Sequence, residues 1–190
     1  MLLLGGASGV GKTQVSYRLA SHFEVGLTEV DDFQVILERM TTPEQYPPLH
    51  YWGSPEQRSQ PLDDDAMLEH TLAYGAVMTQ ALEPVIANHL ESRAPLVLEG
   101  DFILPALAAQ SSHDDIPTAG QVRGLFIYEP DEAQIASNFL TREGEEQSHC
   151  ARLCWRYSEW LREECVRLGI SAIPARPWES VLERAIAVVA

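Results

Sequence analysis

The stretch that decides the fold of this chain is Gly6-Ala7-Ser8-Gly9-Val10-Gly11-Lys12-Thr13. A short apolar run, Leu-Leu-Leu at residues 2–4, comes directly before it. After it, Val15, Leu19 and Phe23 follow one another at intervals of four residues, which is typical of one face of a helix. The order is therefore strand, glycine-rich loop, helix.

These eight residues satisfy the pattern G-x-x-x-x-G-K-[ST]. Glycines let the backbone curl so that successive N–H groups face one anion, and the following helix adds the positive end of its dipole. We expect Lys12 to reach the β- and γ-phosphates of a nucleotide and the Thr13 hydroxyl to ligate Mg²⁺. The motif predicts a P-loop whose residues, together with Gln14, bind the nucleotide. The alternative is a glycine-rich turn with a purely structural role.

Lys12 is the single lysine of the chain, beside twelve arginines. With 13 Lys and Arg against 28 Asp and Glu, the formal charge is −15. This balance argues against nucleic acids and anionic membranes as partners, because both are held by clustered basic residues. An anionic ligand then has to be held by local backbone N–H groups, Mg²⁺ and a few arginines.

The chain of 190 residues fits one domain covering residues 1–190. Further short apolar runs alternate with helical patterns, at residues 26–31, 95–99, 124–128 and 170–173. Such alternation predicts a three-layer α/β/α fold of the P-loop type, with a five-stranded parallel sheet between helices.

No apolar stretch approaches the roughly 20 residues that a membrane span needs. The N-terminal apolar run lacks a basic segment before it and meets glycines at once, so a secretory signal is not expected. Three cysteines are an odd count that suits a reducing compartment better than a disulfide framework. These features predict a cytoplasmic protein.

Two carboxylates, Asp31 and Asp32, end the second apolar run. Ligands of open α/β sheets bind at the carboxyl ends of the strands, and a kinase needs a base there for the substrate hydroxyl. We choose Asp31 as this base and Asp32 as a helix cap or a water-mediated metal contact. The alternative is that both residues only cap the following helix, for which Asp is favoured.

The third apolar run ends in Leu96-Val97-Leu98-Glu99-Gly100-Asp101. An acid at the end of such a strand has the form of a Walker B element, with Glu in place of Asp. Hard cations prefer oxygen ligands, so Glu99 is our first candidate for the metal site and Asp101 the second. The alternative is simple termination of the strand by surface acids.

The P-loop, Asp31-Asp32-Phe33 and Leu98-Glu99-Gly100 together resemble small-molecule P-loop kinases of the uridine kinase and nicotinamide riboside kinase type. The resemblance implies that Asp31 is the general base and that Glu99 lies near metal and substrate. The segment from Leu98 to Pro105 is also similar to an element of 2-phosphoglycerate kinases, although Asp101 departs from what that family tends to carry.

Kinases of this fold carry a mobile lid whose arginines close on the transferring phosphoryl group. We expect the lid at residues 141–157. Arg142 lies in the break between two helical patterns, and Arg152 and Arg156 lie one turn apart on the second. The alternative for these three residues is a solvated helix face with local ion pairs.

Residues 41–90 match no pattern that identifies a ligand, and we expect them to form a substrate-binding cap and helix. Their first part is rich in proline and aromatic residues and includes Trp52 and Arg58, and the helix should begin at Asp63–Asp65 and bend near Pro84.

A final segment, Pro174-Ala175-Arg176-Pro177-Trp178, resembles the loop that borders the adenine in such kinases. Arg176 or Trp178 would stack on the purine; alternatively, Trp178 only anchors the last helix.

The sequence thus predicts an ATP- and Mg²⁺-dependent phosphotransferase that acts on a hydroxyl of a small molecule. The acceptor could be a nucleoside, a phosphorylated sugar acid, an antibiotic or a nucleotide sugar, and the enzyme a monomer or homodimer. The alternative is a nucleotide-binding switch protein that hydrolyses ATP slowly and signals through a protein partner. A GTPase is excluded, since the N-K-x-D element needs a second lysine.

Overall fold

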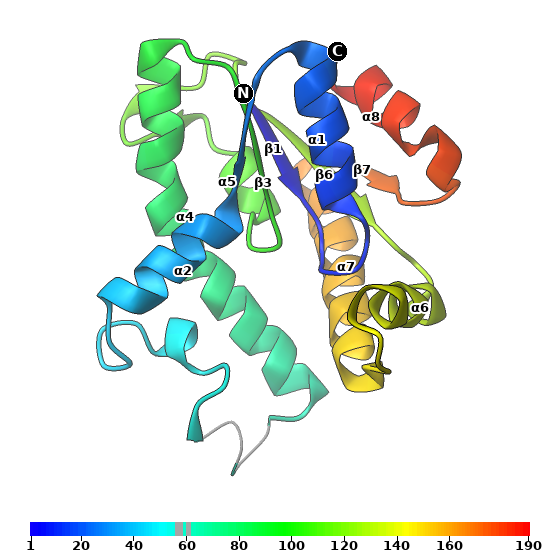
Figure 1. The fold of residues 1–190 in the computed structure, drawn as a ribbon. Coiled ribbons are helices and arrows are strands. Elements are labelled where there is room, and N and C mark those ends of the chain that lie inside the picture. Colours follow the sequence, from blue (N-terminus) through cyan, green and yellow to red (C-terminus); the bar gives the residue numbers. More distant parts are fainter. Residues whose placement is uncertain (56–58, 60–61) are drawn as a thin grey trace.

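The computed structural model describes residues 1–55, 59 and 62–190 and is built around a five-stranded sheet in the order β2-β3-β1-β6-β7 (Figure 1). All neighbouring strands of this sheet are parallel. The strands are β1 (Leu2–Gly5), β2 (Gly26–Glu29), β3 (Leu96–Gly100), β6 (Arg123–Tyr128) and β7 (Ser171–Pro174). Every residue of β1 and β3 is buried, as expected for central strands covered on both faces.

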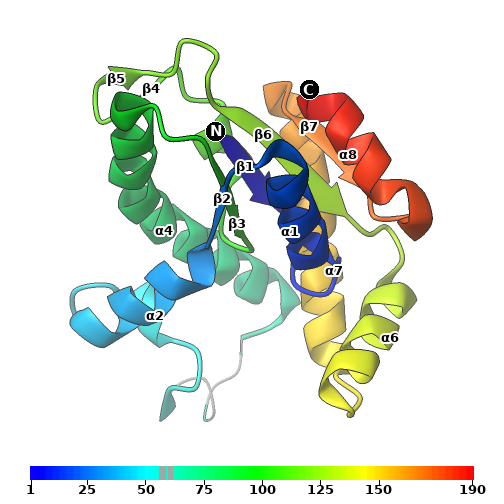
Figure 2. The same ribbon diagram turned by 45° about the horizontal axis from the view of Figure 1, so that its top comes forward.

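Helices lie on both faces of the sheet, which confirms the predicted three-layer α/β fold (Figures 1 and 2). One face is covered by α1 (Lys12–Phe23) and α8 (Val181–Val189), which contact each other. The other face carries α5 (Pro105–Ala108) and α7 (Ser148–Leu168), with α4 (Asp64–Ser92) packed beside α7. None of the described helices is long and apolar enough to cross a membrane.

The remaining elements lie around these layers. They are α2 (Val30–Met40), α6 (Glu132–Glu143), the 3-10 helices η1 (Pro47–His50) and η2 (Trp178–Ser180), and the strands β4 (Ser112–His113) and β5 (Ile116–Pro117). In both views α2 and α6 flank the P-loop from opposite sides (Figures 1 and 2). The chain continues from α2 into the segment predicted as the cap, and the end of α6 overlaps the start of the segment predicted as the lid.

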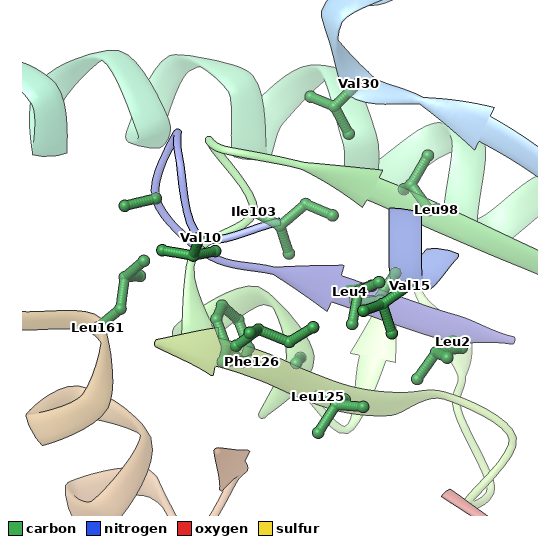
Figure 3. Packing of buried hydrophobic residues seen from close by; sticks show 14 of the residues in the cluster. Leu2, Leu4, Val10, Val15, Val30, Leu98, Ile103, Leu125, Phe126 and Leu161 are labelled. Atoms are coloured by element: carbon green, nitrogen blue, oxygen red, sulfur yellow. The ribbon is translucent and has the colours of Figure 1, made fainter. Parts of the chain in front are cut away.

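Buried apolar side chains hold the P-loop against the sheet (Figure 3). Leu4 and Val15 are fully buried, and Phe126 and Leu161 are 1% exposed. Val10, inside the loop itself, is also 1% exposed and belongs to the same core. Burial of each such side chain contributes about 1.5–3 kcal/mol, so the loop is anchored from within.

Two boundaries differ from the sequence-based expectation near the site. β2 ends at Glu29 and α2 begins at Val30, so Asp31 and Asp32 lie in the first turn of a helix and not at the end of a strand. The expectation that Asp32 caps this helix is wrong, because the N-cap is Glu29 and makes no side-chain cap bond. Both aspartates instead face the positive end of the helix dipole, which favours acids in the first turn.

Arg142 was expected in a break between helices, and this is wrong. α6 continues to Glu143 and ends at Gly144, whose φ of 79° provides a left-handed C-cap. The segment 111–120, expected as a plain polar loop, contains the antiparallel pair β4–β5. Asp114 and Asp115 at its turn have φ values of 43° and 64°, as the tight turn of a two-residue hairpin requires.

Candidate active site

The P-loop has the backbone geometry of an anion cradle. Gly9 and Gly11 have φ values of 83° and 90°, in the left-handed region that side chains rarely adopt. A Cβ on Gly11 would also come within 2.6 Å of the Trp178 ring. Gly11 is the N-cap of α1 and makes no side-chain cap bond. The first N–H groups of α1 therefore remain available to an anion at the positive end of the helix.

Lys12, the first residue of α1, is 7% exposed and lies among carboxylates. Its Nζ forms an ion pair with Asp101 and lies 3.5 Å from Glu99 Oε1. Burial works to lower the pKa of Lys12, but the charges of Asp101 and Glu99 outweigh it, so the net pKa is raised. Lys12 is thus a charged ammonium at the end of the P-loop.

Thr13 and Glu99 bring two hard oxygen donors together. The Thr13 hydroxyl donates to Glu99 Oε1 over 3.3 Å, and Leu4 of β1 lies in register with Glu99 of β3. Burial is the largest cause that raises the pKa of Glu99, and Lys12 acts against it. This donor set fits Mg²⁺. Among the described residues no group of three or more His, Cys, Asp or Glu could hold a metal alone, so a cation here needs further ligands from nucleotide or water.

Asp31 lies next to this cluster at the start of α2. Asp31 is an exposed residue, yet the desolvation of its carboxyl raises its pKa above the usual 3.8 and the charge of Asp101 raises it further, whereas Lys12 lowers it. A carboxylate with a raised pKa is better suited to accept a proton. Asp32 is exposed in the same turn, and its contact with a metal stays a prediction.

Asp101, our second candidate for the metal site, lies nearer to the Lys12 ammonium than Glu99 does. It contacts Lys12 directly. The Tyr157 hydroxyl of α7 donates to the backbone carbonyl of Asp101 over 2.8 Å. This bond ties the turn after β3 to α7 and fixes Asp101 beside the P-loop.

A cavity of about 640 Å³ opens beside the P-loop. Two predicted residues, Arg142 and Arg176, line it together with the loop. The full lining consists of Gly9, Val10, Gly11, Lys12, Thr13, Gln14, Asn138, Thr141, Arg142, Arg176 and Trp178. The structure thus brings together one arginine of the predicted lid, the predicted adenine loop and the predicted phosphate loop.

Asn138 is a lining residue that the sequence reasoning missed. Its Nδ2 donates to the carbonyl of Gly9 over 2.7 Å and so links α6 to the P-loop. It lies one helical turn before Arg142, and this spacing was the available signal.

Arg152 and Arg156 do not line this cavity and pair with acids of other helices. Arg152 lies 3.5 Å from Glu132 and 3.9 Å from Asp64. Arg156 forms an ion pair with Asp65 and lies 4.0 Å from Asp64. These contacts correspond to the alternative of local ion pairs, and a lid role for both arginines stays a prediction.

The described part of the cap packs through aromatic contacts. The ring centroids of Tyr51 and His70 lie 4.5 Å apart, and Tyr74 stacks on Phe102 at 4.2 Å. The Tyr74 hydroxyl donates to Glu38 over 2.7 Å and ties α4 to α2.

Asp63 caps α4 through a bond from the N–H of Ala66, as predicted. Arg58, which the sequence placed in the cap, lies outside the described residues.

The class of fold follows from these features: a parallel sheet whose central strand leads through G-x-x-x-x-G-K-T into a helix is an α/β P-loop fold. No family model matches the chain. A 2-phosphoglycerate kinase of Methanococcus maripaludis (strain C6 / ATCC BAA-1332) is 26% identical over 121 residues, which are 60% of this chain and 39% of that protein. The chain thus matches less than half the length of this relative.

Two solved structures are similar over nearly the whole chain. A gluconokinase from Sinorhizobium meliloti 1021 has a TM-score of 0.50 at 21% identity, covering 99% of this chain and 90% of its own. A shikimate kinase from Acinetobacter baumannii, in complex with shikimate, has a TM-score of 0.55 at 13% identity, covering 99% and 91%. The resemblance to P-loop small-molecule kinases is therefore confirmed, and at these identities it establishes the fold.

Proposed function

We propose that this protein is an ATP-dependent phosphotransferase that moves the γ-phosphoryl group of Mg·ATP to a hydroxyl of a small metabolite. The position of Asp31 carries the proposal. This carboxylate lies at the start of α2, close enough to Lys12 and Asp101 for their charges to shift its pKa. A protein that only binds or hydrolyses a nucleotide needs no base at that place, whereas a kinase does.

The P-loop supplies the phosphate site of this mechanism. Its N–H groups and the ammonium of Lys12 bind the phosphates, whose oxygens replace Asp101 as partners of Lys12. Thr13 and Glu99 would hold Mg²⁺, which would supply positive charge to offset the negative charge of the phosphates. Arg142 of α6 lines the same cavity and would add positive charge near these phosphates.

Asp31 acts on the acceptor. Its carboxylate accepts the proton of the attacking hydroxyl, and its raised pKa strengthens it as a base. General base catalysis of this kind contributes about 10²–10⁴-fold to a rate. The rest of the acceleration comes from alignment of the hydroxyl with the γ-phosphorus and from the surrounding positive charge.

The finer assignments extend this proposal. Residues 41–90 select the acceptor, and residues 141–157 close over the site and exclude water. The names of the similar proteins make gluconate, shikimate and 2-phosphoglycerate the first acceptors to try, followed by nucleosides.

A panel of these acceptors with Mg·ATP tests the function through ADP release. We expect release that depends on one class of acceptor in the wild type and falls by about 10²–10⁴-fold in Asp31→Asn. Calorimetric titration with ADP should show that this variant still binds nucleotide. A rate of ADP release that no acceptor changes, and that is the same in the wild type and in Asp31→Asn, would contradict the proposal and favour the switch protein.

A further inference from the structure

Glu129 is a buried carboxylate beside the nucleotide cavity that the mechanism above does not use. It directly follows β6 and is 2% exposed. Its Oε1 accepts a bond from the N–H of Asp131 over 3.2 Å, whereas Oε2 has no hydrogen-bond partner among the described residues. A buried carboxylate oxygen without a donor is unfavourable unless a positive charge faces it.

The positive charge that faces Glu129 belongs to Arg176. Its Nε lies 3.5 Å from Glu129 Oε2, and its side chain is 44% exposed. The guanidinium carbon also lies 6.0 Å from the centroid of the Trp178 ring. Arg176 is thus held by a buried carboxylate and flanked by an indole, while nearly half of it remains open to the cavity that it lines.

Trp178 fixes this arrangement relative to the P-loop. The edge of its ring lies against Gly11, since a Cβ there would be 2.6 Å from Cη2. Both Arg176 and Trp178 line the cavity that continues along the P-loop to Gln14. The cavity therefore leaves space beside these two residues for the base of a nucleotide whose phosphates lie on the loop.

We propose that Glu129 is a positioning residue for the nucleotide base. It holds the guanidinium of Arg176 through Nε, so that the exposed face of this planar cation stacks on the purine. Guanidinium planes stack well on aromatic rings, and a partner on Nε leaves the face free. The inference rests on the proposed function, because it takes ATP as the nucleotide.

The variants Glu129→Gln, Arg176→Ala and the double variant test this role by calorimetric titration with Mg·ATP and with Mg·tripolyphosphate. Glutamine keeps the shape of Glu129 but removes its charge. We expect Glu129→Gln to weaken Mg·ATP binding by about tenfold and the double variant to bind no worse than Arg176→Ala. Tripolyphosphate has no base, so its affinity should be unchanged. Arg123→Ala, at the opposite end of β6, is the matched control and should bind both ligands normally.

Steady-state kinetics with the assigned acceptor give a second readout. The KM for ATP should rise in Glu129→Gln, while kcat and the KM for the acceptor stay constant, which a general loss of structure would not produce. Equal losses for Mg·ATP and Mg·tripolyphosphate, or independent effects of the two substitutions that multiply in the double variant, would overturn the role of Glu129. A wild type that binds neither ligand would overturn the proposed function itself.

Discussion

Val30 lies directly over Gly100, so closely that a Cβ on Gly100 would come within 2.4 Å of the Val30 Cβ. Val30 is fully buried and is the first residue of α2, and Asp31 follows it. Gly100 ends β3 one residue after Glu99. The glycine therefore sets how closely the proposed base approaches the carboxylate and ammonium cluster on the sheet.

Gly100→Ala should displace α2 and lower kcat. The added methyl group has to push Val30 away, and Asp31 moves with it. A shift of about 1 Å in a catalytic group can reduce a rate by about 100-fold. Steady-state kinetics with the assigned acceptor measure the loss. Gly26→Ala on β2 is the matched control, since its Cβ would meet only Leu96 Cδ1 at 3.3 Å. An unchanged kcat in Gly100→Ala would refute the role of the contact between Gly100 and Val30.

Lys12→Arg should abolish transfer while the protein still folds. A planar guanidinium does not occupy the same space between glycine backbone and phosphates as a narrow ammonium. Displacement of a preorganised cationic donor from the phosphoryl group costs on the order of 10²–10³-fold or more in kcat. The assay is ADP release, with circular dichroism and thermal melting as controls for folding. A fully active Lys12→Arg enzyme would show that the assigned role is wrong.

The pH profile should report the raised pKa of Asp31. A base must be ionised to work, so kcat/KM should fall as the pH drops through this pKa, which lies above the usual 3.8. Asp101→Asn removes a negative charge that raises the pKa of Asp31. Its residual activity should therefore show an acidic limb at lower pH than the wild type. An acidic limb that stays in place or moves to higher pH contradicts the assignment of Asp31.

Two variants distinguish a lid role of Arg156 from its role in the ion pair with Asp65. Asp65→Asn breaks the pair and leaves the arginine, whereas Arg156→Ala removes both. Because the Asp65 side chain is 83% exposed, neither change should alter the melting temperature much. If Arg156 closes on the phosphoryl group, only Arg156→Ala lowers kcat. Equal activity in the two variants would instead assign Arg156 to the surface ion pairs.

The sheet was predictable because its signal is local. Apolar runs such as residues 2–4 and 96–99 are buried on both faces, and their order along the chain limits the topology. The structural position of Asp31 was harder to predict from the sequence. Val30 continues the apolar pattern of β2, and periodicity alone does not reveal that it already belongs to α2, because its contact with Gly100 comes from a distant strand.

The other site contacts could not be predicted because they join residues that are far apart in the sequence. Arg156 meets Asp65, which lies 91 residues earlier, and no spacing on α7 could reveal that pair. Glu129 did carry a signal, since it ends an apolar run as Glu99 does. Its partner Arg176, however, comes from the loop after β7, and only the parallel pairing of β6 with β7 brings the two together.

The most direct measurement follows an isotope label from ATP to product. Mg·ATP labelled with ¹⁸O in the γ-phosphoryl group is incubated with the acceptor that stimulates ADP release, and the products are analysed by mass spectrometry. The wild type should place the label in a phosphorylated acceptor, and Asp31→Asn should leave the acceptor unlabelled while still binding nucleotide. Label recovered only in inorganic phosphate, at equal rates in both proteins, would contradict phosphoryl transfer with Asp31 as the base.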